Sequence, residues 1–242
     1  MPLHPTPLRR LPLFCSLSAL CALGAHHFHA SQTPSWRALS PGLESRSFSA
    51  QGVRIEAFRA PASAFRVVGG RYATASEWLR ATRARVVVNA GFFDGAGRPM
   101  GLRRGKNTPA NRLRASDWGV FWVKNGVAHL SHTRDFPREA RPDEAVQCGP
   151  RLVVSGRVLG FKPQLARRTG VGIDRQGRVV LAVADGELSL SDWARVWASR
   201  TELNCSDALN MDGGPSTQLA VRGRDDLGIE GGWAVPDVLA FK

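Results

Sequence analysis

Residues 210–217 have the strongest chemical signature in the chain, because they place a carboxylate and hydroxyl groups around two adjacent glycines. Glycine permits a positive φ and close approach of the backbone to a ligand, whereas Pro215 fixes φ and removes one donor. We therefore expect Asp212 and Ser216 to be held at a rigid turn, where they can bind or act on a polar ligand. The alternative is a tight turn between strands with a solvated aspartate.

Two other segments combine a strand-like run with a polar corner. Residues 86–95 are Val-Val-Val-Asn-Ala-Gly-Phe-Phe-Asp-Gly, and residues 167–174 are Arg-Arg-Thr-Gly-Val-Gly-Ile-Asp. Functional residues concentrate where a rigid strand delivers the chain to a loop. The sequence therefore predicts that three distant corners, carrying Asn89, Arg168 and Asp212, converge to line one anion-receptive pocket.

In this order the segments resemble the phosphodiester glycosidase family. Its recurring pieces are an Asn-x-Gly-Phe-Phe corner, a Gly-Pro-x-Leu-Val strand, an Arg-Thr-x-x-Gly strand entry and an Asp-Gly-Gly-Gly-Ser turn, which stand here at 89–93, 149–153, 168–172 and 212–216. The resemblance spans about residues 50–242, with Pro215 in place of the third glycine of the turn. It implies an exported hydrolase that cleaves the bond between a sugar anomeric carbon and a phosphodiester in envelope or extracellular glycoconjugates.

Three residues are the candidates for catalysis. Arg168 is predicted to bind phosphate, because a guanidinium can engage two phosphate oxygens at once, although any arginine in this arginine-rich chain can instead form a structural ion pair. Carboxylates stabilise the oxocarbenium-like transition state of glycosyl transfer, which makes Asp212 a candidate and Asp185 its partner or a ligand of a sugar hydroxyl. The sequence leaves their acid and base roles open.

A second group of residues can bind the substrate, by neutral hydrogen-bonding groups, by ring contact or by close backbone approach. These predicted substrate-binding residues are Asn89, Gly91, Phe92, Thr169, Asn210, Gly213, Gly214 and Ser216. No cofactor and no metal ligand are predicted, but Asp94, Asp185, Asp212 and backbone carbonyls have the oxygen chemistry that calcium or magnesium prefers. The histidines lack the clustering of a zinc site, and no nucleophile elbow of a serine hydrolase occurs.

Hydrophobic periodicity predicts an α+β fold in a single domain, with mostly antiparallel sheet built from hairpins and a few packed helices. The clearest hairpin surrounds Asn125-Gly126, and two more surround Ser155-Gly156 and residues 175–177. Helical spacing is present over residues 77–84 and 190–203. At 242 residues the chain can bury one substantial core.

The first fifty residues are predicted to lie outside this domain. Arg9-Arg10 and the apolar stretch 11–25 have the layout of a signal peptide or N-terminal anchor over residues 1–30, too short for a comfortable membrane span. Residues 31–50 lack periodicity and are predicted to be a flexible linker, followed by the domain at 51–242. A periplasmic or secreted location follows from this layout.

The formal net charge of +13 favours anionic partners. Its basic residues are scattered and form no stripe interleaved with aromatics, which argues against nucleic acid and leaves a phosphate-linked sugar or an anionic glycan. The alternative function is a catalytically silent module that binds anionic polysaccharide or assists its export. The oligomeric state stays open.

Cys15 and Cys21 lie in the predicted leader, which leaves Cys148 and Cys205 in the exported part. An even pair in an exported protein predicts a disulfide bond. The alternative is two buried free thiols, because cysteine is often only a packing residue.

Overall fold

Antiparallel pairing organises the domain into three sheets. The computed structural model describes residues 1, 35–106 and 108–242. Its large compact unit runs from Thr33 to Lys242. The predicted signal peptide or anchor at 1–30 lies outside the described residues, apart from Met1.

The largest sheet has the order β1 (Arg37–Ser40), β2 (Leu43–Ala50), β3 (Val53–Ala60), β14 (Val179–Ser189), β13 (Leu165–Asp174), β15 (Cys205–Asn210), β11 (Arg151–Val154) and β12 (Arg157–Val158). The second has the order β7 (Thr108–Asn111), β6 (Arg103–Gly105), β10 (Glu144–Cys148), β8 (Gly119–Lys124) and β9 (Val127–His132). The third has the order β16 (Leu219–Val221), β5 (Val86–Asn89), β17 (Val235–Phe241) and β4 (Phe65–Ala73).

The helical elements are short. Two are α-helices, α1 (Ala75–Ala81) and α2 (Leu190–Ala198). The 3-10 turns are η1 (Ala62–Ala64), η2 (Thr133–Asp135), η3 (Arg138–Ala140), η4 (Gly214–Ser216) and η5 (Asp225–Leu227). The predicted α+β class with mostly antiparallel sheet is confirmed.

One central core joins the three sheets. It contains Phe58 and Leu181 of the largest sheet, Phe121 of the second, and Leu239 and Phe241 of the third. Because side chains alternate along a strand, the other face of each sheet needs its own cover. The large sheet is covered by α2 and the third sheet by α1, so each strand near the site has one core-facing side and one helix-facing side.

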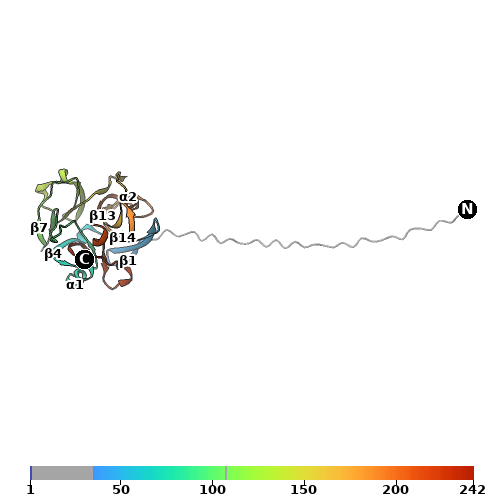
Figure 1. Ribbon diagram of the computed structural model, residues 1–242, viewed down its shortest axis with the longest axis horizontal. Helices are drawn as coiled ribbons and strands as arrows, with labels where there is room; N and C mark the ends of the chain where they lie inside the picture. Colours follow the sequence, from blue (N-terminus) through green and yellow to red (C-terminus); the bar gives the residue numbers. More distant parts are fainter. Residues whose placement is uncertain (2–34, 107) are drawn as a thin grey trace. The chain divides into compact units, whose positions relative to one another are not determined.

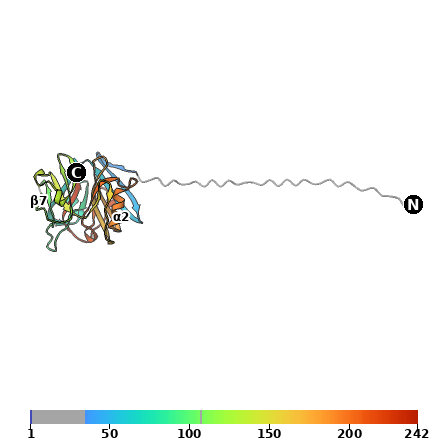
Figure 2. The same cartoon turned by 90° about the horizontal axis from the view of Figure 1, so that it is seen from above.

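Local chemistry explains both helices. Thr74 and Glu77 form a reciprocal capping box at the start of α1, which buries Trp78 against the third sheet. The Ser189 hydroxyl caps α2 by accepting a hydrogen bond from the Asp192 amide at 3.0 Å. Two tryptophans of this helix, Trp193 and Trp197, are fully buried against the large sheet. Figure 1 shows α2 beside β13 and β14, and Figure 2 shows β7 and α2 on opposite sides of the domain.

All three expected hairpins are present, as β8–β9, β11–β12 and β13–β14. β8–β9 turns at Asn125-Gly126, whose φ values of 50° and 76° suit the two-residue hairpin turn. The helix expected over 190–203 ends at Ala198, because Ser199 leaves the helical conformation and is extended, with a ψ of 126°. No helix in the described residues is long and apolar enough to cross a membrane.

The flexible linker predicted at 31–50 is wrong over most of its length. β1 and β2 occupy residues 37–40 and 43–50 and pair with each other, and β2 pairs with β3 from Glu44 to Ala50. Serines dilute the apolar pattern here, yet Leu43 and Phe48 are buried on opposite faces of the sheet. The domain therefore begins well before residue 51.

The predicted disulfide bond is also wrong. Cys148 and Cys205 are both free and buried. Cys148 packs in the central core, whereas Cys205 packs with the tryptophans of α2 on the other face of the large sheet. Burial raises the pKa of both thiols, so the alternative of two packing thiols describes this chain.

Candidate functional site

The site is built on the paired ends of β13 and β15. Gly170 lies opposite Asn210, and the Met211 amide donates to the Thr169 carbonyl at 2.9 Å, which continues the same register beyond the strand. This register places Arg168 opposite Asp212. Because alternate residues share a face, Arg168, Asn210 and Asp212 lie on one side of the sheet.

Two glycines of β13 show that this is the side of the sheet that α2 covers. A Cβ on Gly170 or Gly172 would stand 2.6 or 2.8 Å from the Trp197 ring of α2. The helix thus covers this face up to Gly170 and stops short of the end of the strand. A pocket of about 310 Å³ opens there, a size that suits a small ligand. It is lined by Phe92, Gly149, Pro150, Gln164, Ala166, Arg168, Leu190, Asn210, Asp212, Gly213 and Gly214.

Arg168 is a buried cation that lacks a counter-charge among the described residues. Its side chain is 4% exposed, and its Nε donates to the Leu188 carbonyl at 3.0 Å. One terminal nitrogen donates to the Gln164 carbonyl, and the other lies 4.0 Å from where a Cβ on Gly213 would stand. Burial lowers the pKa of this guanidinium. A buried charge is costly unless it is paired, so an anionic ligand would complete its environment.

Asp212 stands across from Arg168 without an ion pair between them. Burial raises the pKa of its carboxyl, against the lowering effect of hydrogen bonds that include the Gly213 amide, which donates to Oδ1 at 3.0 Å. Its backbone amide donates a hydrogen bond to the Ala90 carbonyl at 3.0 Å. Guanidinium and carboxylate therefore face one pocket with room for a ligand between them.

Asn89 joins the three corners from the core side. Its Nδ2 donates to the Asp212 carbonyl at 2.7 Å, and its Oδ1 accepts the Thr169 hydroxyl at 2.7 Å and the Gln218 amide at 3.2 Å. The three corners therefore meet, but only Arg168 and Asp212 line the pocket, and Asn89 lies behind it. Asn89 and Thr169 are fully buried and satisfied within the protein, so the prediction that they contact substrate is corrected to a positioning role.

Some of the remaining predicted substrate-binding residues line the pocket, and the others lie behind it. Phe92, Asn210, Gly213 and Gly214 line the pocket, whereas Gly91 and Ser216 do not. A Cβ on Gly91 would stand 3.1 Å from the Gln147 carbonyl, so this glycine serves close strand packing. Ser216 is the last residue of the η4 turn and is buried.

Pro215 is exposed beside the pocket. Its carbonyl accepts the Gly232 and Trp233 amides at 2.8 and 3.2 Å. The substitution of proline for the family's third glycine therefore leaves a firmly held turn.

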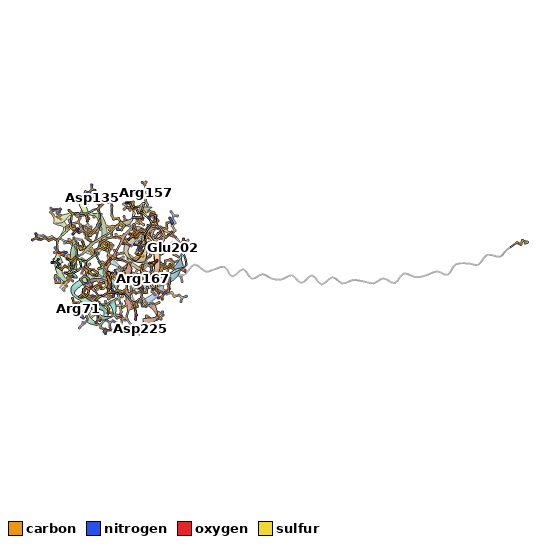
Figure 3. All side chains as sticks on the ribbon, in the orientation of Figure 1. Arg71, Asp135, Arg157, Arg167, Glu202 and Asp225 are labelled. Carbon is orange, nitrogen blue, oxygen red and sulfur yellow. The ribbon has the colours of Figure 1, made fainter. Side chains whose placement is uncertain are left out.

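Asp185 lies outside the pocket. It pairs with Arg54 at 2.8 Å and with Arg167 at 3.2 Å. Figure 3 labels Arg167, which lies near the middle of the domain in that view, whereas Arg71, Asp135 and Arg157 lie at its periphery. The Arg167 side chain faces away from Arg168, because the two are consecutive on β13. Asp185 is therefore a member of an ion-pair group on the core-facing side, and its assignment as the partner of Asp212 is corrected.

Gln164 and Asp237 were not predicted from the sequence. Gln164 lines the pocket together with the Gly149–Pro150 step of the Gly-Pro-x-Leu-Val segment, whose peptide bond is cis. Asp237 of β17 is a buried carboxyl whose pKa burial raises to about 7, against the lowering effect of Arg103 at 3.5 Å. An aspartate within the apolar run Val235–Phe241 was the signal that marked it.

No group of three or more His, Cys, Asp or Glu side chains is arranged to hold a metal ion in the part of the chain that the structure describes.

Comparisons with known proteins identify the family and the fold. A family model described as phosphodiester glycosidase matches residues 82–242, more than half of the chain. No curated protein matches.

Among solved structures, the catalytic domain of zebrafish N-acetylglucosamine-1-phosphodiester alpha-N-acetylglucosaminidase, auto-inhibited by its pro-peptide, is similar with a TM-score of 0.69 and 18% identity. The similarity covers 87% of this chain and 86% of that one. A hypothetical protein from Synechocystis has a TM-score of 0.59 and 15% identity over 86% of this chain and 63% of that one. At these identities the two structures establish a shared fold.

Proposed function

Because the chain belongs to the phosphodiester glycosidase family, we propose that it hydrolyses the bond between a sugar anomeric carbon and a phosphodiester. The observation that carries this proposal is the buried Arg168, which has no carboxylate partner among the described residues and faces the same pocket as Asp212. A guanidinium in that position suits a phosphate oxygen. A carboxylate across from it suits the carbon to which the phosphate is attached.

The leaving group explains how one pocket carboxylate can be enough. A phosphate departs as a stable anion and needs little help from a general acid. In the proposed reaction Arg168 balances the charge that develops on the departing phosphate, and Asp212 stabilises the oxocarbenium-like carbon as nucleophile or as base for water. The anomeric C–O bond breaks with its electron pair going to the phosphate oxygen, and the oxygen of a water molecule forms the new C–O bond. That water loses one proton to the phosphate or to solvent, and a free sugar and a phosphomonoester leave.

We propose further that the protein is exported and acts on envelope or extracellular glycoconjugates in the periplasm or outside the cell. The charged and apolar pattern of residues 1–30 supports export. The basic composition of the chain supports an anionic substrate.

The test is to incubate the purified protein with a panel of sugar phosphodiesters and to measure released reducing sugar and phosphomonoester. We expect Asp212→Asn to abolish turnover with the fold intact. We expect Arg168→Lys to raise KM or lower kcat, because the point charge of an ammonium group replaces a bidentate hydrogen-bond donor. Asp185→Asn is the matched carboxylate control, since that residue lies outside the pocket. Unchanged turnover in Asp212→Asn would remove this residue from the mechanism.

The pH profile provides a second readout. Asp212 must be ionised to act as nucleophile or base, and burial raises its pKa. Activity should therefore fall on acidification at a higher pH than for an ordinary aspartate. Retained glycan binding without release from any substrate would favour a silent module instead.

A further inference from the structure

Asn210 is the buried amide on the floor of the pocket. The residue is 4% exposed and lines the same cavity as Arg168 and Asp212. Its Nδ2 donates to the Met211 carbonyl at 2.6 Å and to the Gly149 carbonyl at 3.2 Å. Both hydrogens of the amide group are therefore used within the protein.

These two bonds fix the orientation of the amide. Rotating it by half a turn would aim Oδ1 at two carbonyl oxygens, which are acceptors and cannot bind it. The oxygen is thus directed away from Met211 and Gly149. It is buried and has no hydrogen-bond partner among the described residues. A buried acceptor without a donor is costly, and in native proteins it commonly marks a place that a ligand or another polar group completes.

The surroundings of Asn210 leave the pocket as the place from which a donor can come. Gly170, directly across the strand pair, has no side chain, and Trp197 closes the space beyond it. Phe92, Pro150 and Leu190 line the same pocket and have no side-chain donor, whereas Gln164 and Arg168 have side-chain donors there but do not hydrogen-bond to Asn210 Oδ1. A ligand here would meet this fixed acceptor beside apolar side chains, which suit the C–H faces of a sugar.

The spacing along β15 agrees with a single ring. Asn210 and Asp212 lie two residues apart on one face, which separates them by roughly 7 Å along an extended chain. That is on the order of the distance across one hexose ring with its substituents. A sugar whose anomeric carbon stands at Asp212 can therefore place a ring substituent at Asn210.

We propose that Asn210 Oδ1 accepts a hydrogen bond from a hydroxyl or amide N–H substituent of the sugar ring, and that this contact selects sugars that bear a donor at one particular ring position. The inference rests on the proposed function, because it takes Asp212 as the residue at the anomeric carbon. The pocket then holds the sugar, and the group on the far side of the phosphate lies outside it.

The experiment uses the full chain and a series of phosphodiesters that share one aglycone. The parent sugar is compared with analogues in which each hydroxyl or acylamino group in turn is replaced by hydrogen or methylated. For the wild type we expect one position at which both changes lower kcat/KM at least about tenfold, because the buried acceptor then loses its donor. In Asn210→Ala the parent and that analogue should differ less than about threefold. Gln176→Ala, which alters an exposed amide on the β13–β14 turn, should keep the full discrimination.

A binding measurement separates the two proposals. Calorimetry with the parent sugar 1-phosphate and its deoxy analogues reports the contact without turnover, and it needs only the wild type if Asn210→Ala does not fold. Hydrolysis or binding with equal preference for every analogue would overturn the role of Asn210 and leave the reaction standing. Selective binding without hydrolysis would reject the reaction and keep the contact. Failure to bind any sugar phosphate would overturn both the proposed reaction and the proposed Asn210 contact.

Discussion

Gly213 offers a steric test of how the carboxylate is positioned. A Cβ at this residue would stand 2.7 Å from the carbonyl oxygen of Arg167, which is backbone and cannot rotate away. An ordinary contact between carbon and oxygen is about 3.3 Å or longer. In Gly213→Ala the turn must therefore move from β13 by roughly 0.6 Å. Its φ of −122° suits alanine, so strain in the backbone dihedrals adds nothing to the effect.

The displaced element carries Asp212, whose Oδ1 accepts the Gly213 amide. Because a misplacement of about 1 Å can cost on the order of a hundredfold in rate, we expect kcat to fall at least about tenfold. Overpacking should also lower the free energy of unfolding by about 1–3 kcal/mol.

The assay is steady-state turnover of a sugar phosphodiester, combined with urea unfolding. Gly95→Ala is the matched control, because that glycine is exposed, has nothing within 4 Å of its Cβ position and needs no positive φ. If the Gly213 variant matches the Gly95 variant in both rate and stability, close contact between the turn and β13 does not position the carboxylate.

Three further outcomes are expected. Thr169→Val removes the hydroxyl bonded to Asn89 Oδ1 and should lower the free energy of unfolding by about 1 kcal/mol in urea titrations; no change would show that the Gln218 amide alone satisfies that oxygen. Asp237 has a folded pKa of about 7, above its unfolded value, so the native state binds more protons and wild-type stability should fall as pH rises from about 4 to about 7. Asp237→Asn should flatten that decline in unfolding curves, and an equal decline in both proteins would refute this assignment. A reductant should leave the melting temperature unchanged, since Cys148 and Cys205 are free thiols, and a lower melting temperature would contradict this.

The sequence predicts the corners of the site well, because each is marked by local chemistry. Asn89 and Asp212 each follow a run of buried strand residues and precede glycine, and Arg168 lies on β13 two residues before the first of its two glycines. The hairpins at Asn125-Gly126 and Ser155-Gly156 are visible for the same reason, since their turn residues take positive φ.

What sequence reasoning misses depends on strand order and on the face that each strand presents. Asp185 lies within β14 and Asp212 lies two residues beyond the end of β15, and their side chains lie on opposite faces of the sheet. Only the pairing of both segments with β13 reveals this difference. Asn89 has the chemistry of a sugar ligand, yet its partners come from residues far away along the chain, which no local pattern shows. The sequence of β1 and β2 resembles a linker because serines and charged residues dilute its apolar alternation, although β1 is the edge strand and β2 is paired on both sides.

The continuous register between β13 and β15 also limits how this protein can be altered. One extra residue inserted between Leu209 and Asp212 would flip every later side chain of that strand end, and the carboxylate would point into the core instead of the cavity. Changes of length are therefore far more damaging here than changes of residue type. A graft of this activity onto another scaffold must transfer both strands as one unit, with their pairing offset preserved.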